Sequence, residues 1–298
     1  MSSSCARAIA AALCVALLCA GCGGSKSHRR ADVSAYVQRV NRIELVMRSQ
    51  LLDVEKAYRH FSTATLARSR PRLVRAEETL RTLDQRLEHV DPPPDARRLH
   101  RLMLQLLSSE VGLSHEVVQL AVFLPAFDAA LRPLGPASAR LGQALAQAKA
   151  PAPHLVRGTK KQIVEARAKY AAAVARAERE QGDAIEQYAG EVRVVERSFG
   201  RLHPPPAMKP TFETERRTLA RVRANGEALA KALRLGQRKR IAALDLRYRT
   251  AARSGASLPA QRAEIAAVKS YDRRVRAVVA MALRVQRELA RLDRTLHS

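Results

Sequence analysis

The residues of this sequence that could carry chemistry are four cysteines, eight histidines and a few closely spaced carboxylates. All four cysteines lie within the first 22 residues, so the rest of the chain has no thiol for a disulfide, a zinc–thiolate site or a nucleophile. The histidines never form the His-x-x-x-His spacing that places two metal ligands on one helix face. The sequence also lacks a glycine-rich phosphate loop, a dinucleotide fingerprint and a Gly-x-Ser-x-Gly elbow. We therefore expect no catalytic residues, no metal site, no cofactor and no enzymatic activity.

The remaining polar residues of interest have structural explanations. Glu77-Glu78 are adjacent, and Glu110 and Glu116 are six residues apart, so neither spacing places two carboxylates on one helix face. We expect these residues on solvated surfaces, paired with Arg. His89 and His203 each precede a run of three prolines, and we expect them to be exposed at helix ends, where they favour the C-terminal dipole. The Tyr and Phe residues mostly fall on apolar stripes and are expected to pack in the core.

The amino-terminal segment has the three-part pattern of a secretory signal. It reads MSSSCARAIAAALCVALLCAGC, in which Arg7 and the amino terminus are positive and residues 9–20 carry no charge. The uncharged stretch is shorter than the roughly 20 residues that a helix needs to span the hydrocarbon core. A cleaved export signal is therefore favoured over a membrane-spanning anchor.

The end of this segment, Leu18-Cys19-Ala20-Gly21-Cys22, resembles the lipobox of bacterial lipoprotein precursors, in which an aliphatic residue and two small residues precede a cysteine. Ala20, Gly21 and Cys22 fit that pattern, whereas Cys19 stands where Leu is usual. The resemblance implies cleavage after residue 21, acylation of Cys22 by palmitate-type chains, and a lipoprotein anchored on the extracytoplasmic face of the cell membrane. The alternative is an ordinary signal peptide that is cleaved elsewhere.

The chain is strongly basic, with 53 Lys and Arg against 28 Asp and Glu and a formal net charge of +25. Removal of residues 1–21, whose only charged side chain is Arg7, would lower this charge to +24. A basic body tethered to a membrane is attracted to anionic lipids by about 1 kcal/mol for each basic group near the surface. Anionic wall polymers and acidic envelope proteins are equally sensible partners. Nucleic acid would bind such a surface nonspecifically, but an exported chain has no physiological nucleic-acid partner.

The elements that would position these residues are helices. From Asp32, a candidate N-cap, apolar residues recur at steps of three and four nearly throughout, which predicts an all-α fold. We expect Pro71 to interrupt the first helical stretch, with Ser69 capping a restart, and Pro125 to end a later helix. Residues 125–153 contain five prolines and form either a short broken helix or a linker.

Two proline triplets, at 92–94 and 204–206, must each end a helix. A shift of 112 residues superposes the triplets and also five apolar positions. These pairs are Leu73 with Ile185, Leu80 with Val192, Leu83 with Val195, Leu87 with Phe199 and Val90 with Leu202. The pattern indicates a diverged tandem repeat of long helix, proline triplet and return helix. The alternative is that heptad-like helices align easily at any multiple of seven.

The helix predicted before the second proline triplet is unusually long. Thr159 and Gln162 have capping-box spacing, and a helix from Thr159 to Leu202 would measure about 66 Å at 1.5 Å per residue. Such a helix cannot fit inside a compact globule, so we expect an elongated bundle or antiparallel hairpins with coiled-coil-like stripes, which are compatible with self-association. Gly182 and Gly190 are expected to be weak points in it.

Together these features give one hypothesis of organisation and three of function, the third of which is an enzyme with a site assembled from scattered helices. We expect a signal peptide at 1–21, a tether at 22–31, a first helical repeat at 32–150, a linker at 151–158 and a second repeat with a long last helix at 159–298. The leading function is a non-enzymatic, lipid-anchored extracytoplasmic helical protein that binds or spaces a partner at the membrane–cell wall interface. The alternative is a binding module that holds a small ligand or an anionic envelope polymer in a cleft between the repeats.

Overall fold

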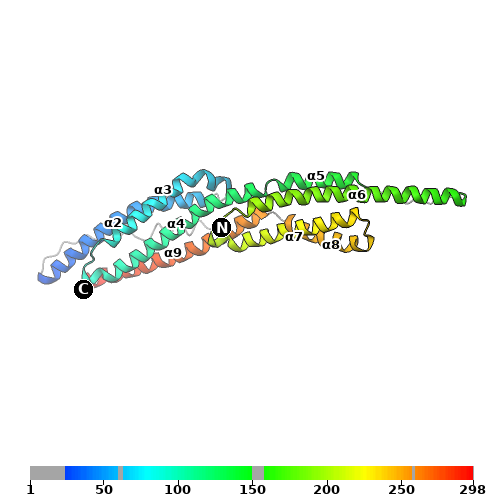
Figure 1. Cartoon of the computed structure of the whole chain (residues 1–298). Coiled ribbons are helices and arrows are strands. Elements are labelled where there is room, and N and C mark those ends of the chain that lie inside the picture. The colour runs from blue at the N-terminus through cyan, green and yellow to red at the C-terminus, as the bar shows by residue number, and fades with distance from the viewer. Residues whose placement is uncertain (1–23, 60–62, 150–157, 257–258, 298) are drawn as a thin grey trace. The chain divides into compact units, whose positions relative to one another are not determined.

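The computed structural model describes residues 24–59, 63–149, 158–256 and 259–297, which form helices joined by short turns. These ranges contain no β-strand, which confirms the predicted all-α helical bundle. The elements, labelled as in Figure 1, are α2 (Gly24–Arg59), α3 (Thr63–Glu88), η1 (Pro94–Ala96), α4 (Arg97–Leu131), α5 (Leu134–Gln147), α6 (Lys160–Phe199), η2 (Pro206–Met208), α7 (Lys209–Arg234), α8 (Arg238–Ala256) and α9 (Pro259–His297).

Packing divides these helices into two units whose bounds differ from the predicted repeats. Among the described residues, unit 1 contains those up to Pro125 together with those from Glu264 onward, and unit 2 contains Ala126–Ala263. Most of the last helix, α9, packs in unit 1, whereas the predicted second repeat at 159–298 contains all of this helix. Polar contacts between α4 and α9 show why, since Arg98 lies 3.3 Å from Glu288 and the Ser270 hydroxyl donates to Glu116 at 2.6 Å.

The two proline triplets form turns with nearly the same backbone conformation. Pro93 has φ −59° and ψ 154°, and Pro205 has φ −62° and ψ 156°. In the first turn the Ala96 N–H donates to the Pro93 carbonyl at 2.9 Å. In the second turn the Met208 N–H donates to the Pro205 carbonyl at 2.8 Å. Four of the five superposed apolar pairs are buried in both copies, and the fifth, Val90 with Leu202, is half-buried in both. The turns and these positions agree with the repeat hypothesis, although the packing units do not coincide with the repeats.

Two prolines that were expected to end helices lie inside them. Pro71 is within α3 and Pro125 is within α4, so the predicted interruption at the first and the stop at the second are both wrong. An interior proline costs about 3 kcal/mol or more. Apolar side chains on both sides are buried, Leu66 and Leu73 around the first proline and Phe123 among those around the second. Burial of each such side chain contributes about 1.5–3 kcal/mol, which offsets the lost hydrogen bond. The region after Pro125 holds a regular helix, α5, up to Gln147.

The expected tether is largely helical. Helix α2 begins at Gly24, so residues 24–31 are not extended and Asp32 lies inside a helix rather than at its N-cap. The polar residues of this stretch include no proline, and they continue the register of a helix that buries Val33 and Tyr36. As a helix, residues 24–31 rise by only about 12 Å. The signal peptide at 1–21 lies outside the described residues, as do residues 151–157 of the predicted linker.

The long helix of unit 2 begins at the predicted cap and packs closely on its neighbour. The Thr159 hydroxyl accepts from the Gln162 N–H, and the Gln162 side chain accepts from the Thr159 N–H, which completes the capping box. Helix α6 lies along α7 (Figure 1). A Cβ added at Gly182 would lie 3.0 Å from the Ala230 carbonyl oxygen, whereas one at Gly190 would meet nothing within 4 Å. Gly182 is therefore a close-contact position and not the weak point that we expected.

A tight turn places α8 beside α7. Gly236 has a φ of +61°, a conformation that favours glycine, and its N–H bonds to the Leu233 carbonyl at 3.1 Å. The Gln237 N–H bonds to the Ala232 carbonyl at 2.9 Å, which completes a Schellman motif at the end of α7. At the other end of α7, Phe212 stacks on Phe199 of α6 with centroids 4.5 Å apart. The Gly236 turn and the Phe212–Phe199 contact thus fix the two ends of α7, which packs against both α6 and α8.

Candidate functional site

The site residue that the sequence predicts, Cys22, lies outside the described residues, so lipid attachment at this position stays a prediction. The other three cysteines also lie there. Within the described part of the chain, no group of three or more His, Cys, Asp or Glu side chains is placed to hold a metal ion.

Three of the four carboxylates named from the sequence are buried, which corrects the expectation of solvated surfaces. Glu77, Glu110 and Glu116 are buried, and only Glu78 is exposed. The reason is that each buried residue lies on a helix face turned toward another helix. Glu116 on α4 accepts from the Arg274 guanidinium of α9, a residue 158 positions later in the chain. The expected pairing with Arg is therefore found, but it links two helices instead of covering a surface.

Two further buried glutamates, which the sequence analysis did not single out, are used in the same way. Glu215 of α7 is 2% exposed, and its Oε1 lies 2.5 Å from the Arg262 guanidinium of α9, within unit 2. Burial raises the pKa of Glu215, while the charge and hydrogen bond of Arg262 act against this rise. In unit 1, Glu288 of α9 faces Arg98 of α4 and Arg291 of its own helix, and the hydrogen bond from Arg291 leads in lowering its pKa. Buried carboxylates thus tie helices together through basic partners.

One contact between a buried glutamate and a histidine combines the residue types that serve as a general base in enzymes. Glu77 Oε1 of α3 lies 2.8 Å from His115 Nδ1 of α4, an arrangement that can orient an imidazole for proton transfer. The other side chains placed against this imidazole are Arg81, at 3.4 Å, and Gln119, at 2.8 Å, and neither is a nucleophile. Arg81 also holds Glu77 at 2.5 Å. The contact is explained by its role in joining α3 to α4.

A second histidine is buried beside a tyrosine. The Tyr36 hydroxyl of α2 lies 3.0 Å from His100 Nδ1 of α4, and both side chains are buried. Burial lowers the pKa of His100, while the charge of Asp91 acts in the other direction, and burial also raises the pKa of Tyr36. A shift of 112 places Phe212 opposite His100, so the second copy has an aromatic ring where the first has this hydrogen bond.

The histidines near the proline triplets behave as predicted. His89 and His203 are both exposed, and His89 Nδ1 lies 2.6 Å from the Gln85 carbonyl oxygen in the last turn of α3. The aromatic residues at 36, 199 and 212 are buried as expected, whereas Tyr170 is exposed.

Two surface grooves of about 360 Å³ lie among the described residues of the chain, one within each unit. The groove of unit 1 lies at the first proline triplet, and its lining has both signs of charge. These residues are Asp32, Ala35, Tyr36, Arg39, Asp91, Pro92, Pro93, Pro94 and Arg97. Its two aspartates and two arginines balance, so the groove has no preference for an anion or a cation.

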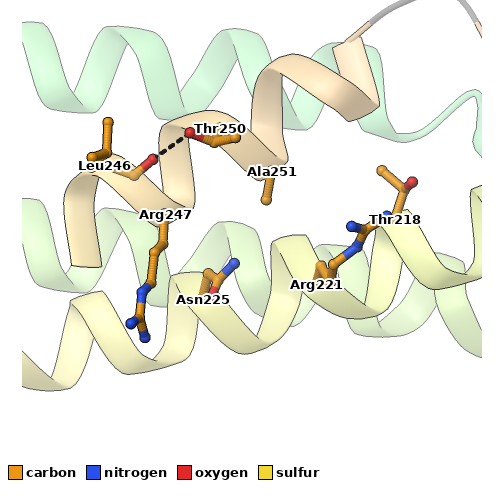
Figure 2. A pocket seen from close by; sticks show the side chains of 7 residues that line it. All are labelled: Thr218, Arg221, Asn225, Leu246, Arg247, Thr250 and Ala251. Carbon is orange, nitrogen blue, oxygen red and sulfur yellow. Dashed lines mark hydrogen bonds between the residues drawn. The ribbon is translucent and has the colours of Figure 1, made fainter. Parts of the chain in front are cut away.

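The groove of unit 2 lies between α7 and α8 and is lined by two arginines and no acid (Figure 2). Helix α7 contributes Thr218, Arg221 and Asn225, which lie on one face of the helix at intervals of three and four. Helix α8 contributes Leu246, Arg247, Thr250 and Ala251. The sequence analysis missed this groove, although the i, i+3, i+7 spacing of polar residues on α7 was a signal that could have found one side of it.

One helical stretch, Pro94–Gln147, is long and apolar enough to cross a membrane by length and composition. Of its most apolar 18-residue window, 39% is buried inside the structure. The core helix of a protein outside a membrane can have the same length and composition.

The chain matches no protein-family model, no curated protein and no solved structure.

Proposed function

We propose that this chain is a non-enzymatic, lipid-anchored helical protein of the cell envelope that binds or spaces a partner at the membrane–cell wall interface. The observation that carries the proposal is the division of charge between the inside and the outside of the bundle. Buried glutamates face basic side chains on neighbouring helices, so their charges are compensated inside the bundle. The arginines in excess lie on exposed helix surface, for example Arg179, Arg197 and Arg247. That surface is available to an anionic partner.

The proposed anchor would hold this surface near a membrane. Cys22 of the lipobox-like segment is followed at Gly24 by α2, a helix of 36 residues. A helical start to the body keeps the basic surface closer to the acylated residue than an extended tether would. Two or more acyl chains on one cysteine give stable anchoring, whereas a single chain is marginal. Lipid anchoring and basic charge would then act together at an anionic surface.

The proposal is tested by complementation. Cells that lack the gene are expected to show an envelope defect, measured as sensitivity to a cationic detergent, and the wild-type gene restores resistance. A Cys22→Ala variant, present at the same level and exported, is expected not to restore it, because the folded body would no longer be held at the membrane. Full restoration by Cys22→Ala, or a deletion without any envelope defect, would contradict the proposal.

A second candidate function, binding of an anionic envelope polymer, is favoured by the α7–α8 groove. The sequence-based hypothesis located such a site in a cleft between the repeats, whereas this groove lies within unit 2. Its lining of two arginines without an acid is the specific observation in its favour.

A further inference from the structure

We infer that the groove between α7 and α8 binds a chain-like phosphate polyanion, with Arg221, Asn225 and Arg247 as its ligands. This inference deepens the proposed function and rests on it, because it assumes that the chain is a binding protein and names the class of ligand that it takes. Three observations carry it: donors without internal partners, the absence of acid from the lining, and the arrangement of the donors in a row.

The first observation is that the three donor groups are not used within the described structure. The Arg221 Nε donates to the Arg217 carbonyl, and no described residue accepts from its terminal guanidinium nitrogens. Asn225 and Arg247 have no hydrogen bond or ion pair with a described residue through their side chains. A guanidinium presents a planar fork of donors that matches a phosphate group bidentately, and a charge-assisted bond of this kind is stronger than a neutral one.

The second observation is that two neighbouring arginines, Arg223 and Arg249, are paired with acids while the groove arginines are not. On α7, Arg223 lies 2.7 Å from Glu196 and 3.3 Å from Glu227. On α8, the sole acidic residue is Asp245, and it accepts from Arg249 at 2.9 Å. The acid nearest in sequence to Arg247 is therefore already occupied. The groove has a local positive charge with no compensation from its own lining, unlike the balanced groove of unit 1.

The third observation is the row in which the donors lie. In Figure 2 the Asn225 side chain stands between those of Arg247 and Arg221, and the three reach the groove from both of its walls. Arg221 and Asn225 are one turn apart on α7, which is about 6 Å along the helix. A single phosphate ion cannot contact all three donors as well as a chain of linked phosphates can. Leu246, which is 68% exposed, gives the groove an apolar edge against which the backbone of a polymer can lie.

A polymer is favoured over a lipid headgroup because the donors line a groove that is open along two helices. A bilayer presents its phosphates on a surface, whereas a polymer chain can enter a groove and follow it. We therefore expect a soluble phosphate chain to bind the groove, and anionic vesicles to contact the basic surface of the chain more broadly.

The test measures binding of fluorescently labelled inorganic polyphosphate to the purified full chain by anisotropy. Arg221→Gln/Arg247→Gln is expected to weaken binding at least tenfold and to lower the slope of log K against log salt by about two. The control Arg179→Gln/Arg197→Gln removes the same charge from exposed positions of α6 and is expected to stay within twofold of wild type. Asn225→Ala, which changes no charge, is expected to weaken binding about threefold. Arg221 and Arg247 are exposed, so thermal melting followed by circular dichroism should show unchanged folding.

Several outcomes would overturn the inference. Equal losses in the groove and control variants would show diffuse attraction to the whole basic surface. Equal binding of polyglutamate at the groove would exclude selectivity for phosphate. Binding of phosphatidylglycerol vesicles that depends on the groove arginines more strongly than polyphosphate binding does would make the ligand a headgroup. None of these results bears on acylation of Cys22 or on complementation, so failure of this site and failure of the proposed function remain distinguishable.

Discussion

Two glycines of α6 give opposite predictions for the same substitution. Gly182 and Gly190 lie eight residues apart in one helix, and replacing a helical glycine by alanine contributes about 1 kcal/mol of stability through backbone propensity. At Gly190 an added Cβ meets nothing within 4 Å, so Gly190→Ala is expected to stabilise unit 2 by about that amount.

At Gly182 the same Cβ meets α7. It would lie 3.0 Å from the Ala230 carbonyl oxygen, 3.2 Å from Arg234 Cγ and 3.4 Å from Leu233 Cβ. The nearest atom belongs to the backbone and cannot move without shifting the helix. Overpacking of this kind typically costs about 1–3 kcal/mol. Gly182→Ala is therefore expected to lose the propensity gain and to destabilise unit 2 by up to about 2 kcal/mol. Because the propensity effect is common to both variants, their difference of about 1–3 kcal/mol measures the packing alone.

The assay is native-state hydrogen exchange with mass spectrometry on peptides of α6 and α7, which reports local opening free energies even if the two units unfold separately. Urea unfolding followed by helicity supplies a second readout. If Gly182→Ala protects these peptides as strongly as Gly190→Ala does, α6 and α7 do not approach as closely as described, and the packing argument fails.

Two further predictions concern buried charges. Burial lowers the pKa of His100 below its ordinary value of 6.5, so the unfolded chain binds the proton more readily than the folded chain. The contribution of His100 to the free energy of unfolding is therefore fully present above pH 6.5. Below pH 6.5 the free energy of unfolding falls by up to about 1.4 kcal/mol per pH unit. Paired urea titrations should show this slope in Tyr36→Phe, which keeps the imidazole, but not in Tyr36→Phe/His100→Phe; equal slopes would refute the assignment. Arg262→Met leaves the charge of Glu215 buried and is expected to destabilise unit 2 by about 3 kcal/mol, whereas Glu215→Leu/Arg262→Met is expected to be near neutral. A double variant no more stable than Arg262→Met in thermal melting would contradict this account of the pair.

The features that the sequence predicted correctly are those that depend on neighbouring residues. Proline triplets break helices wherever they occur, so both turns were predictable. The capping box of α6 was predictable for the same reason, since Thr159 and Gln162 satisfy each other's backbone groups. The all-α fold followed from apolar periodicity, which a helix needs whatever its partner.

The features that the sequence did not predict depend on which helices meet. Glu116 and Arg274 are 158 positions apart, and nothing in the local pattern of either residue indicates the other. Gly182 and Gly190 look alike in sequence, and only the position of α7 distinguishes them. Pro71 was misjudged because its local cost is outweighed by burial of flanking side chains, which becomes known only with the tertiary structure.

The lipid anchor is the central claim of the proposed function, and one measurement tests it most directly. Membranes and soluble fractions are prepared from cells that express wild type or Cys22→Ala, and the intact mass of the native protein is determined in each. The proposal predicts that wild type lies in the membrane fraction with the mass of residues 22–298 plus acyl chains, and that both the added mass and the membrane location are lost in Cys22→Ala. A soluble wild-type product without acyl chains would contradict the proposal and leave a basic helical protein whose ligand is to be sought in solution.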